Sequence, residues 1–208
     1  MLFRSLEVYH SLGFASQRIA EEATIDTQSA ASVAAVPAQA EIQVRRYDRS
    51  SGASAQIDEQ LEEVTEDWLH TRHIGELGFT IGRFSLESLA DGPVFLLGKR
   101  HRVEAFCAWL PYGGGRAMVL DLMRQRHAAP SQTAETLLSE SLLQLKEAGI
   151  TEVSLSTASL KSSNQEIGDP VDRDLMARFA PRWENRYIVY PRGAALARIQ
   201  YALAAVQF

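Results

Sequence analysis

The chain has 208 residues, a formal net charge of −5 and 46% hydrophobic residues, which is enough to form one globular domain, or one and a half small ones. No stretch of about 18 uninterrupted apolar residues occurs, so we expect no membrane-spanning helix. Glu7 and His10 interrupt the N-terminal apolar residues, which excludes a typical signal peptide. The single cysteine, Cys107, has no partner for an internal disulfide, which favours a reducing location on the cytoplasmic side.

Charge is unevenly distributed along the chain. Residues 56–67 contain six acidic and no basic residues, whereas residues 99–127 and 171–198 are rich in arginine. We therefore expect an acidic helix to mask two basic segments, so the net charge does not exclude an anionic partner. Arginine suits phosphate and carboxylate groups, although genomic base composition gives the same excess over lysine.

The first 55 residues give the weakest structural signal. Their pattern predicts a helix over residues 2–20, a short strand over 23–26, a loop or weak helix over 27–40, a strand over 41–48 and a linker over 49–55. Nothing in this portion is expected to fold alone. We interpret it as the end of a larger unit.

Stronger patterns follow the linker. Ile57, Leu61, Val64 and Trp68 recur at helical spacing and predict a helix whose other face is acidic. We expect strands at 79–84, 93–98, 103–110 and 117–123, with a basic turn at 99–102 that joins the second and third into a hairpin. We also expect a helix from Ser131 that ends before Gly149, a strand at 151–156, a polar loop at 161–170, a helix at 171–179, a strand at 186–190 and a closing helix at 196–206.

This order of elements predicts the α+β class, with a mixed, mostly antiparallel sheet flanked by helices. It matches the GNAT-type acyltransferase fold, in which a central strand leads through a loop to a helix whose N-terminus receives a ligand phosphate. The match concerns the fold and does not define the chemistry.

Separated motifs make the comparison more specific. They are VTEDWL at 64–69, FTIGRF at 79–84, DLMR at 121–124 with an Ala-Pro pair at 129–130, FAPRWENRY at 179–187, and the weaker RIAEEATID at 18–26. In this order they resemble the C-terminal domain of phosphatidylglycerol lysyltransferases, bacterial enzymes that move an amino acid from aminoacyl-tRNA onto a membrane lipid. The resemblance implies that residues 56–208 form a GNAT-like domain and that residues 1–55 are the remnant of a partial second GNAT-like unit plus the linker.

The implied reaction is a transesterification, in which a lipid hydroxyl attacks the aminoacyl ester at the 3′ end of the tRNA. It needs a proton acceptor and groups that face the developing oxyanion. The resemblance implies that Asp121 accepts the proton or anchors the α-amino group, and that Arg124 contacts phosphate or the oxyanion. The alternative is that both residues form structural ion pairs at the strand end.

Further substrate-binding candidates follow from the same resemblance. Arg126 and His127 lie in the ligand loop, where a merely solvated loop is the alternative. Ser131, at the start of the helix that follows, is a further substrate-binding candidate. Trp183, Arg186 and Tyr187 could stack on the terminal adenosine and hold its phosphates. For the two aromatic residues, packing into the core against the last helix is the alternative, and it is the one we favour.

The expected cofactor is none, because the reaction requires neither metal nor redox group. His70 and His73 have helical spacing but no third ligand, so a metal site is not expected. The loop at 124–130 contains no glycine and ends in a proline, which disfavours acetyl-CoA as acyl donor.

The expected partners are aminoacyl-tRNA, an anionic phospholipid at the inner face of the cell membrane, and a separate membrane-embedded or N-terminal GNAT-like partner. The chain is expected to lie in the cytoplasm, peripheral to that face of the membrane. The alternative functions are a catalytically inactive module that binds tRNA or lipid, and a small-molecule GNAT-type N-acyltransferase.

Overall fold

The structure is a computed structural model that describes residues 4–29, 42–48, 54–72, 84–99, 101–159, 171 and 173–193. In chain order its elements are α1 (Arg4–Ser11), β1 (Phe14–Asp26), β2 (Gln43–Arg46), α2 (Ser54–Arg72), the 3₁₀ helix η1 (Ser88–Ala90), β3 (Val94–Lys99), β4 (Arg102–Tyr112), the 3₁₀ helix η2 (Gly113–Gly115), β5 (Ala117–Gln125), α3 (Thr133–Glu147), β6 (Glu152–Ser159), α4 (Arg173–Arg178) and β7 (Arg182–Pro191).

All described strands belong to one sheet of seven strands in the order β2-β3-β4-β5-β6-β1-β7. Its neighbours are antiparallel except for β5 and β6, which are parallel. A parallel pair needs a crossover connection, and α3 supplies it between β5 and β6. The expected α+β class with a mixed, mostly antiparallel sheet is therefore confirmed.

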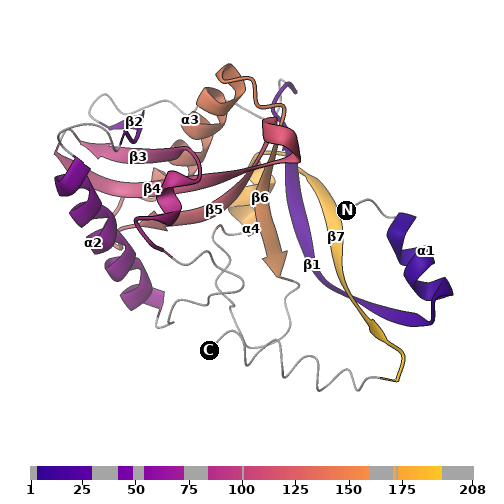
Figure 1. Ribbon diagram of the computed structural model, residues 1–208. Coiled ribbons are helices and arrows are strands. Elements are labelled where there is room, and N and C mark those ends of the chain that lie inside the picture. The colour runs from indigo at the N-terminus through magenta and orange to yellow at the C-terminus, as the bar shows by residue number, and fades with distance from the viewer. Residues whose placement is uncertain are drawn as a thin grey trace.

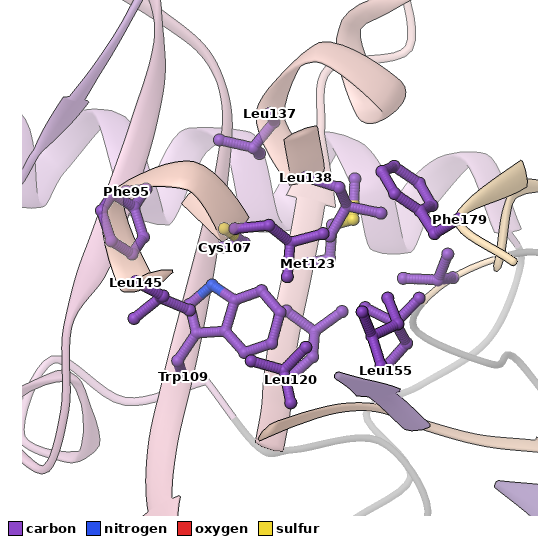
Figure 2. Close-up of a cluster of buried hydrophobic side chains, with 14 of the residues drawn as sticks. Phe95, Cys107, Trp109, Leu120, Met123, Leu137, Leu138, Leu145, Leu155 and Phe179 are labelled. Carbon is purple, nitrogen blue, oxygen red and sulfur yellow. The ribbon is translucent and has the colours of Figure 1, made fainter. Parts of the chain in front are cut away.

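Helices cover both faces of the sheet, which explains why β3 and β4 are apolar at nearly every position. On β3, Val94 and Leu96 point into one core together with Leu61 and Val64 of α2. Phe95, on the opposite face of β3, points into the other, larger core, which packs against α3 and α4. Figure 1 shows α2 on one side of the sheet and α3 on the other. Figure 2 shows the larger core, where Trp109 and Met123 lie among leucines of α3.

The elements with strong local patterns have the predicted positions. The stripe on α2 is confirmed, with Leu61 and Val64 fully buried and Trp68 5% exposed. The hairpin of β3 and β4 is confirmed. Helix α3 ends before Gly149, whose φ of 85° is the left-handed conformation typical of a helix C-terminus.

The expected helix over residues 2–20 is wrong from residue 14 onward. Only Arg4–Ser11 is helical, and Phe14 begins a strand of 13 residues. The reason is tertiary, because β1 lies between β6 and β7 and forms backbone hydrogen bonds with both. The predicted loop at 161–170, the closing helix at 196–206 and all but Phe84 of the strand at 79–84 lie outside the described residues.

The segment expected to be the remnant of a separate unit contributes two strands to this sheet. β1 occupies an interior position and β2 an edge, and no second unit is present among the described residues. Ala23 and Ile25 of β1 belong to the larger core. A boundary at residue 55 remains a prediction. Within the described residues, no helix is long and apolar enough to cross a membrane.

Candidate active site

The parallel strands β5 and β6 diverge within the sheet. They pair only from Ala117 with Glu152 to Val119 with Ser154, although β5 continues to Gln125 and β6 to Ser159. Figure 1 shows the two strands separating beyond this short contact. Beyond Val119 and Ser154 the backbone groups of β5 and β6 therefore do not pair with each other.

Asp121 lies just beyond the last pair of residues that joins β5 to β6. Leu120 pairs with Trp109 of β4 and Leu122 pairs with Ala108, so Asp121 is an extra residue in a β-bulge. Bulges redirect side chains and are frequent next to active sites. Asp121 is half-buried, and burial raises the pKa of its carboxyl group above 3.8, while the positive charge of Arg124 partly offsets this increase.

The opposite arm of the divergence has an unusual backbone. Ser156 of β6 has a φ of 74°, a left-handed conformation that is uncommon for a residue other than glycine. Its N–H donates to Oγ of Ser154 at 3.1 Å. Such conformations cost free energy and are concentrated at functional sites. The strain coincides with the place where the strands separate.

Arg124 is fully buried, so its guanidinium is not exposed at the surface of the protein. Its Nη1 donates to the carbonyl oxygen of Met123 at 3.1 Å. Its guanidinium lies 3.8 Å from the centre of the Trp68 ring of α2, in cation–π geometry. The predicted contact with phosphate or an oxyanion stays a prediction, and this burial favours action through the arginine's charge.

The loop that follows β5 is fixed to α2. Arg126 donates from Nε to the carbonyl oxygen of Val103 at 2.9 Å and from Nη2 to Glu63 at 2.7 Å. The side chain of His127 is exposed, while its backbone N–H donates to Oδ2 of Asp67 at 2.7 Å. These contacts agree with the expectation that the acidic helix masks a basic segment.

Ser131 is exposed and precedes the first residue of α3 by two positions. The expected helix therefore begins at Thr133 rather than at Ser131. Asp121 and Arg124 thus lie on the second half of β5, and Arg126, His127 and Ser131 lie in the segment between β5 and α3.

The other three candidates lie elsewhere in the sheet. Trp183, Arg186 and Tyr187 are on β7, which β6 and β1 separate from β5. At about 4.8 Å between neighbouring strands this separation is about 14 Å where all the strands pair, and it is larger where β5 and β6 diverge. Trp183 is half-buried and contacts the larger core, and the guanidinium of Arg173 lies 4.1 Å from its ring centre. The last helix, against which the packing alternative placed it, lies outside the described residues.

Arg186 belongs to an ion network that the sequence did not reveal. It pairs with Glu22 of β1 and, at 3.2 Å, with Glu184. Glu22 also accepts a hydrogen bond of 2.5 Å from Oγ of Ser154 on β6. The network continues through Arg182, Glu152 and Tyr112. Its members come from four strands that are distant in sequence, so no local pattern could indicate it.

Metal binding finds no support in the described part of the chain, where no group of three histidine, cysteine, aspartate or glutamate residues could hold an ion. His73 lies outside it.

A mixed sheet of seven strands with one diverging parallel pair and helices on both faces places the chain in the GNAT-like class of folds. In agreement, the chain superposes on a GCN5-related N-acetyltransferase from Sphaerobacter thermophilus with a TM-score of 0.51 and 16% identity, over 89% of this chain and 54% of that one. The family described as phosphatidylglycerol lysyltransferase, C-terminal, matches residues 4–190. The chain belongs to this family.

Individual relatives agree with the family match. The chain is 23% identical over 220 residues to the phosphatidylglycerol lysyltransferase of Staphylococcus aureus strain MSSA476, covering 92% of this chain and 26% of that protein. It therefore spans about a quarter of the length of such curated relatives. Its fold is similar to L-PGS from Bacillus licheniformis, with a TM-score of 0.79, 18% identity, and 99% and 70% of the two chains covered. The fold is also similar to the C-terminal domain (DUF2156) of a lysylphosphatidylglycerol synthetase from Agrobacterium fabrum. The TM-score is 0.80 and the sequence identity 21%, over 98% of this chain and 70% of that one.

Proposed function

We propose that this chain transfers an aminoacyl group, lysyl or alanyl, from aminoacyl-tRNA to the hydroxyl of an anionic membrane lipid such as phosphatidylglycerol. Membership of the family supports this reaction class. The observation that carries the proposal is Asp121, a half-buried carboxyl at a bulge where β5 and β6 diverge. The chain would act at the cytoplasmic face of the membrane, where its arginine-rich segments would be attracted to anionic lipid.

In the proposed reaction, the lipid hydroxyl oxygen bonds to the aminoacyl carbonyl carbon while Asp121 takes the hydroxyl proton. The bond between this carbon and the tRNA ribose oxygen then breaks, and Asp121 returns the proton to the ribose oxygen. No net charge or proton is left over. A raised pKa suits this role, because a base works best when its pKa approaches the working pH.

The remaining candidates receive supporting roles. Arg124 would act on the charge of Asp121 from within the protein, and exposed His127 and Ser131 would contact the tRNA end. Arg126 is held by Glu63 and would shape the loop. On β7, Arg186 and Tyr187 would bind a second part of an extended substrate. A substrate that reaches both β5 and β7 is more readily a tRNA than a small molecule.

The test incubates the chain with tRNA charged with labelled lysine or alanine and with phosphatidylglycerol vesicles. We expect label in the lipid phase, and we expect Asp121→Asn to reduce its rate by about 100-fold or more. No label in the lipid, with intact charged tRNA present, would contradict the proposal.

The same assay separates the alternatives. Salt-sensitive binding of tRNA or vesicles without transfer, unchanged by Asp121→Ala, would indicate an inactive binding module. Protection against thermal unfolding by acetyl-CoA would instead indicate a small-molecule N-acyltransferase. A separate membrane-embedded or N-terminal GNAT-like partner is supported if adding such a chain restores transfer.

A further inference from the structure

Exposed apolar side chains are concentrated in and just after α1. Val8, Tyr9 and Leu12 are 56%, 37% and 67% exposed. Among the residues that the structure describes, the other large hydrophobic residues exposed to this degree are Ile19 and Tyr112. Single exposed apolar residues are ordinary, but three within five positions form a patch, and such patches mark binding surfaces. We call Val8, Tyr9 and Leu12 the α1 patch.

The members of the α1 patch lie together because the last helical turn extends to Leu12. The N–H of Leu12 donates to the carbonyl oxygen of Val8 at 3.1 Å and to that of Tyr9 at 3.2 Å. Val8 and Leu12 are therefore one turn apart, on the same side of the helix, with Tyr9 beside Val8.

Two contacts attach α1 to the first residues of β1. The ring of Tyr9 packs edge-on against the ring of Phe14, with 5.9 Å between the ring centres. Nε2 of His10 lies 2.8 Å from Oγ of Ser16, at hydrogen-bond distance. Figure 1 shows α1 standing apart from the rest of the fold, beside the far ends of β1 and β7. The α1 patch is thus held at an extremity of the molecule, where a broad surface can reach it.

The end of the molecule that carries the α1 patch is basic. It consists of α1 and the part of the β1–β7 pair before the bulge at Ile19, which are residues 4–18 and 187–193. These residues include three arginines and one acidic residue, Glu7, whereas the whole chain has a net charge of −5. Arg192 is exposed and follows the last residue of β7, which pairs with the first residue of β1. Apolar side chains beside arginine match an anionic lipid surface, which offers acyl chains and phosphate groups together.

We propose that the α1 patch inserts into the surface of an anionic lipid bilayer, with Arg192 at the level of the lipid phosphates. α1 has 8 residues. At about 1.5 Å per residue it is about 12 Å long, so it would lie along the interface, as amphipathic helices do. Tyr9 suits this depth, because its ring is apolar and its hydroxyl is polar. The proposal rests on the proposed function for the choice of partner, and it adds the residues that would hold the chain beside its acceptor lipid.

The test is sedimentation of the full chain with sucrose-loaded vesicles of phosphatidylcholine, alone or mixed with an equal amount of phosphatidylglycerol. We expect at least about fivefold tighter binding to the mixed vesicles. Leu12→Asp should weaken that binding about tenfold or more, because it removes an inserted apolar side chain and adds a negative charge. Arg192→Gln should weaken it about fivefold. Ala177→Asp adds the same charge at an exposed position of α4 and should weaken binding less than about twofold.

Fluorescence quenching tests insertion itself. Leu12→Trp, bound to mixed vesicles whose acyl chains carry bromine, should lose more fluorescence than the parent, which has three tryptophans. Ala177→Trp should show no additional loss. An unquenched Leu12→Trp on bound vesicles would overturn the proposal, as would equal vesicle binding by the parent and a folded Leu12→Asp. A chain that binds no vesicles but forms a dimer that Leu12→Asp dissociates would overturn it in favour of a second copy.

The docking surface and the proposed function can fail separately. If Leu12→Asp loses vesicle binding while the parent transfers no aminoacyl group, the docking surface holds and the proposed function fails. If the parent and Leu12→Asp transfer label to vesicle lipid at equal rates, the proposed function holds and the docking surface is overturned.

Discussion

Two carboxylates face each other across strands β1 and β7. Glu22 and Glu184 are direct cross-strand partners, an arrangement that destabilises a sheet when the charges are alike. Arg186 bridges the pair by binding both, and Ser154 donates a further hydrogen bond to Glu22. The arginine therefore has a structural role whether or not it also contacts a substrate.

This bridge predicts a large coupling between Arg186 and Glu22. We expect Arg186→Gln to lower the free energy of unfolding by about 1–2 kcal/mol, because it leaves two partly buried carboxylates opposed. The double variant with Glu22→Gln should lose less than the sum of the single changes, measured by urea unfolding. As a control, Arg102→Gln breaks a pair with Glu104 in which the arginine is 61% exposed, and it should change stability by less than about 0.5 kcal/mol. Strict additivity of the first two changes would contradict the bridge.

The raised pKa of Asp121 has a consequence for stability. As the pH rises from below 3.8, the Asp121 carboxyl ionises first in the unfolded chain, because its pKa is higher in the folded chain. The free energy of unfolding therefore falls until the pH has passed the pKa of Asp121 in the folded chain. We therefore expect Asp121→Asn to melt about 2 °C above the parent at about pH 7 and at the same temperature at about pH 3, by calorimetry. Glu59→Gln, an exposed site on α2, should have no effect at either pH. A less stable Asp121→Asn at neutral pH would mean that attraction to Arg124 outweighs burial.

At the scale of elements, the β3–β4 hairpin has a close backbone approach at its turn. The register shifts between Leu97 and Gly98, and a Cβ atom at Gly98 would lie 2.0 Å from the carbonyl oxygen of Arg102. No side chain fits there without moving the backbone. The glycine is thus required by contact with the opposite strand.

We expect Gly98→Ala to destabilise the chain by about 2–4 kcal/mol, because the backbone of the hairpin must shift and both cores rest on it. Urea unfolding measures this effect. Gly193→Ala is the matched control, since a Cβ atom there meets nothing within 4 Å, and it should change stability by less than about 0.5 kcal/mol. Equal stability of the two variants would show that the hairpin adapts without cost.

At the scale of the whole molecule, one sheet carries two cores, and both depend on strands from distant parts of the chain. β1 comes from the first 29 residues, yet it separates β6 from β7 and contributes Ala23 and Ile25 to the larger core. Cys107 lies in the same core, and burial raises the pKa of its thiol to about 12. The rate at which the Cys107 thiol reacts with a reagent therefore shows whether this core is packed or open to solvent.

This arrangement predicts that a fragment of residues 56–208 does not fold as the full chain does. Without β1, strand β7 loses its partner, so we expect Cys107 to react with a thiol reagent in the fragment at least 100-fold faster than in the full chain. Circular dichroism should show loss of the cooperative transition. In the full chain, Ile25→Ala should lower stability by about 2–4 kcal/mol while keeping Cys107 protected. A protected, cooperative fragment would support the predicted boundary at residue 55.

The elements that could be predicted from the sequence are those defined by local periodicity. The stripe on α2, the hairpin and α3 with Gly149 each follow from residues within one segment. The strand that contains the motif at 121–124 was also predicted, although β5 continues past the motif to Gln125, so Asp121 lies within the strand and not at its end. Apolar residues at a period of two or about 3.6 determine which side of such an element is buried, and nothing distant is needed to read them.

The position of β1 and the surroundings of the candidate site depended on tertiary structure. Residues 14–20 were expected to be helical, but hydrogen bonds with β6 and β7 make them a strand. Arg186 meets Glu22 across 164 positions of sequence, and Trp68 meets Arg124 only because α2 packs on β5. Local sequence determined which segments form helices and strands. Strand pairing and helix packing decided which charges meet, since such contacts form only when distant segments have been brought together.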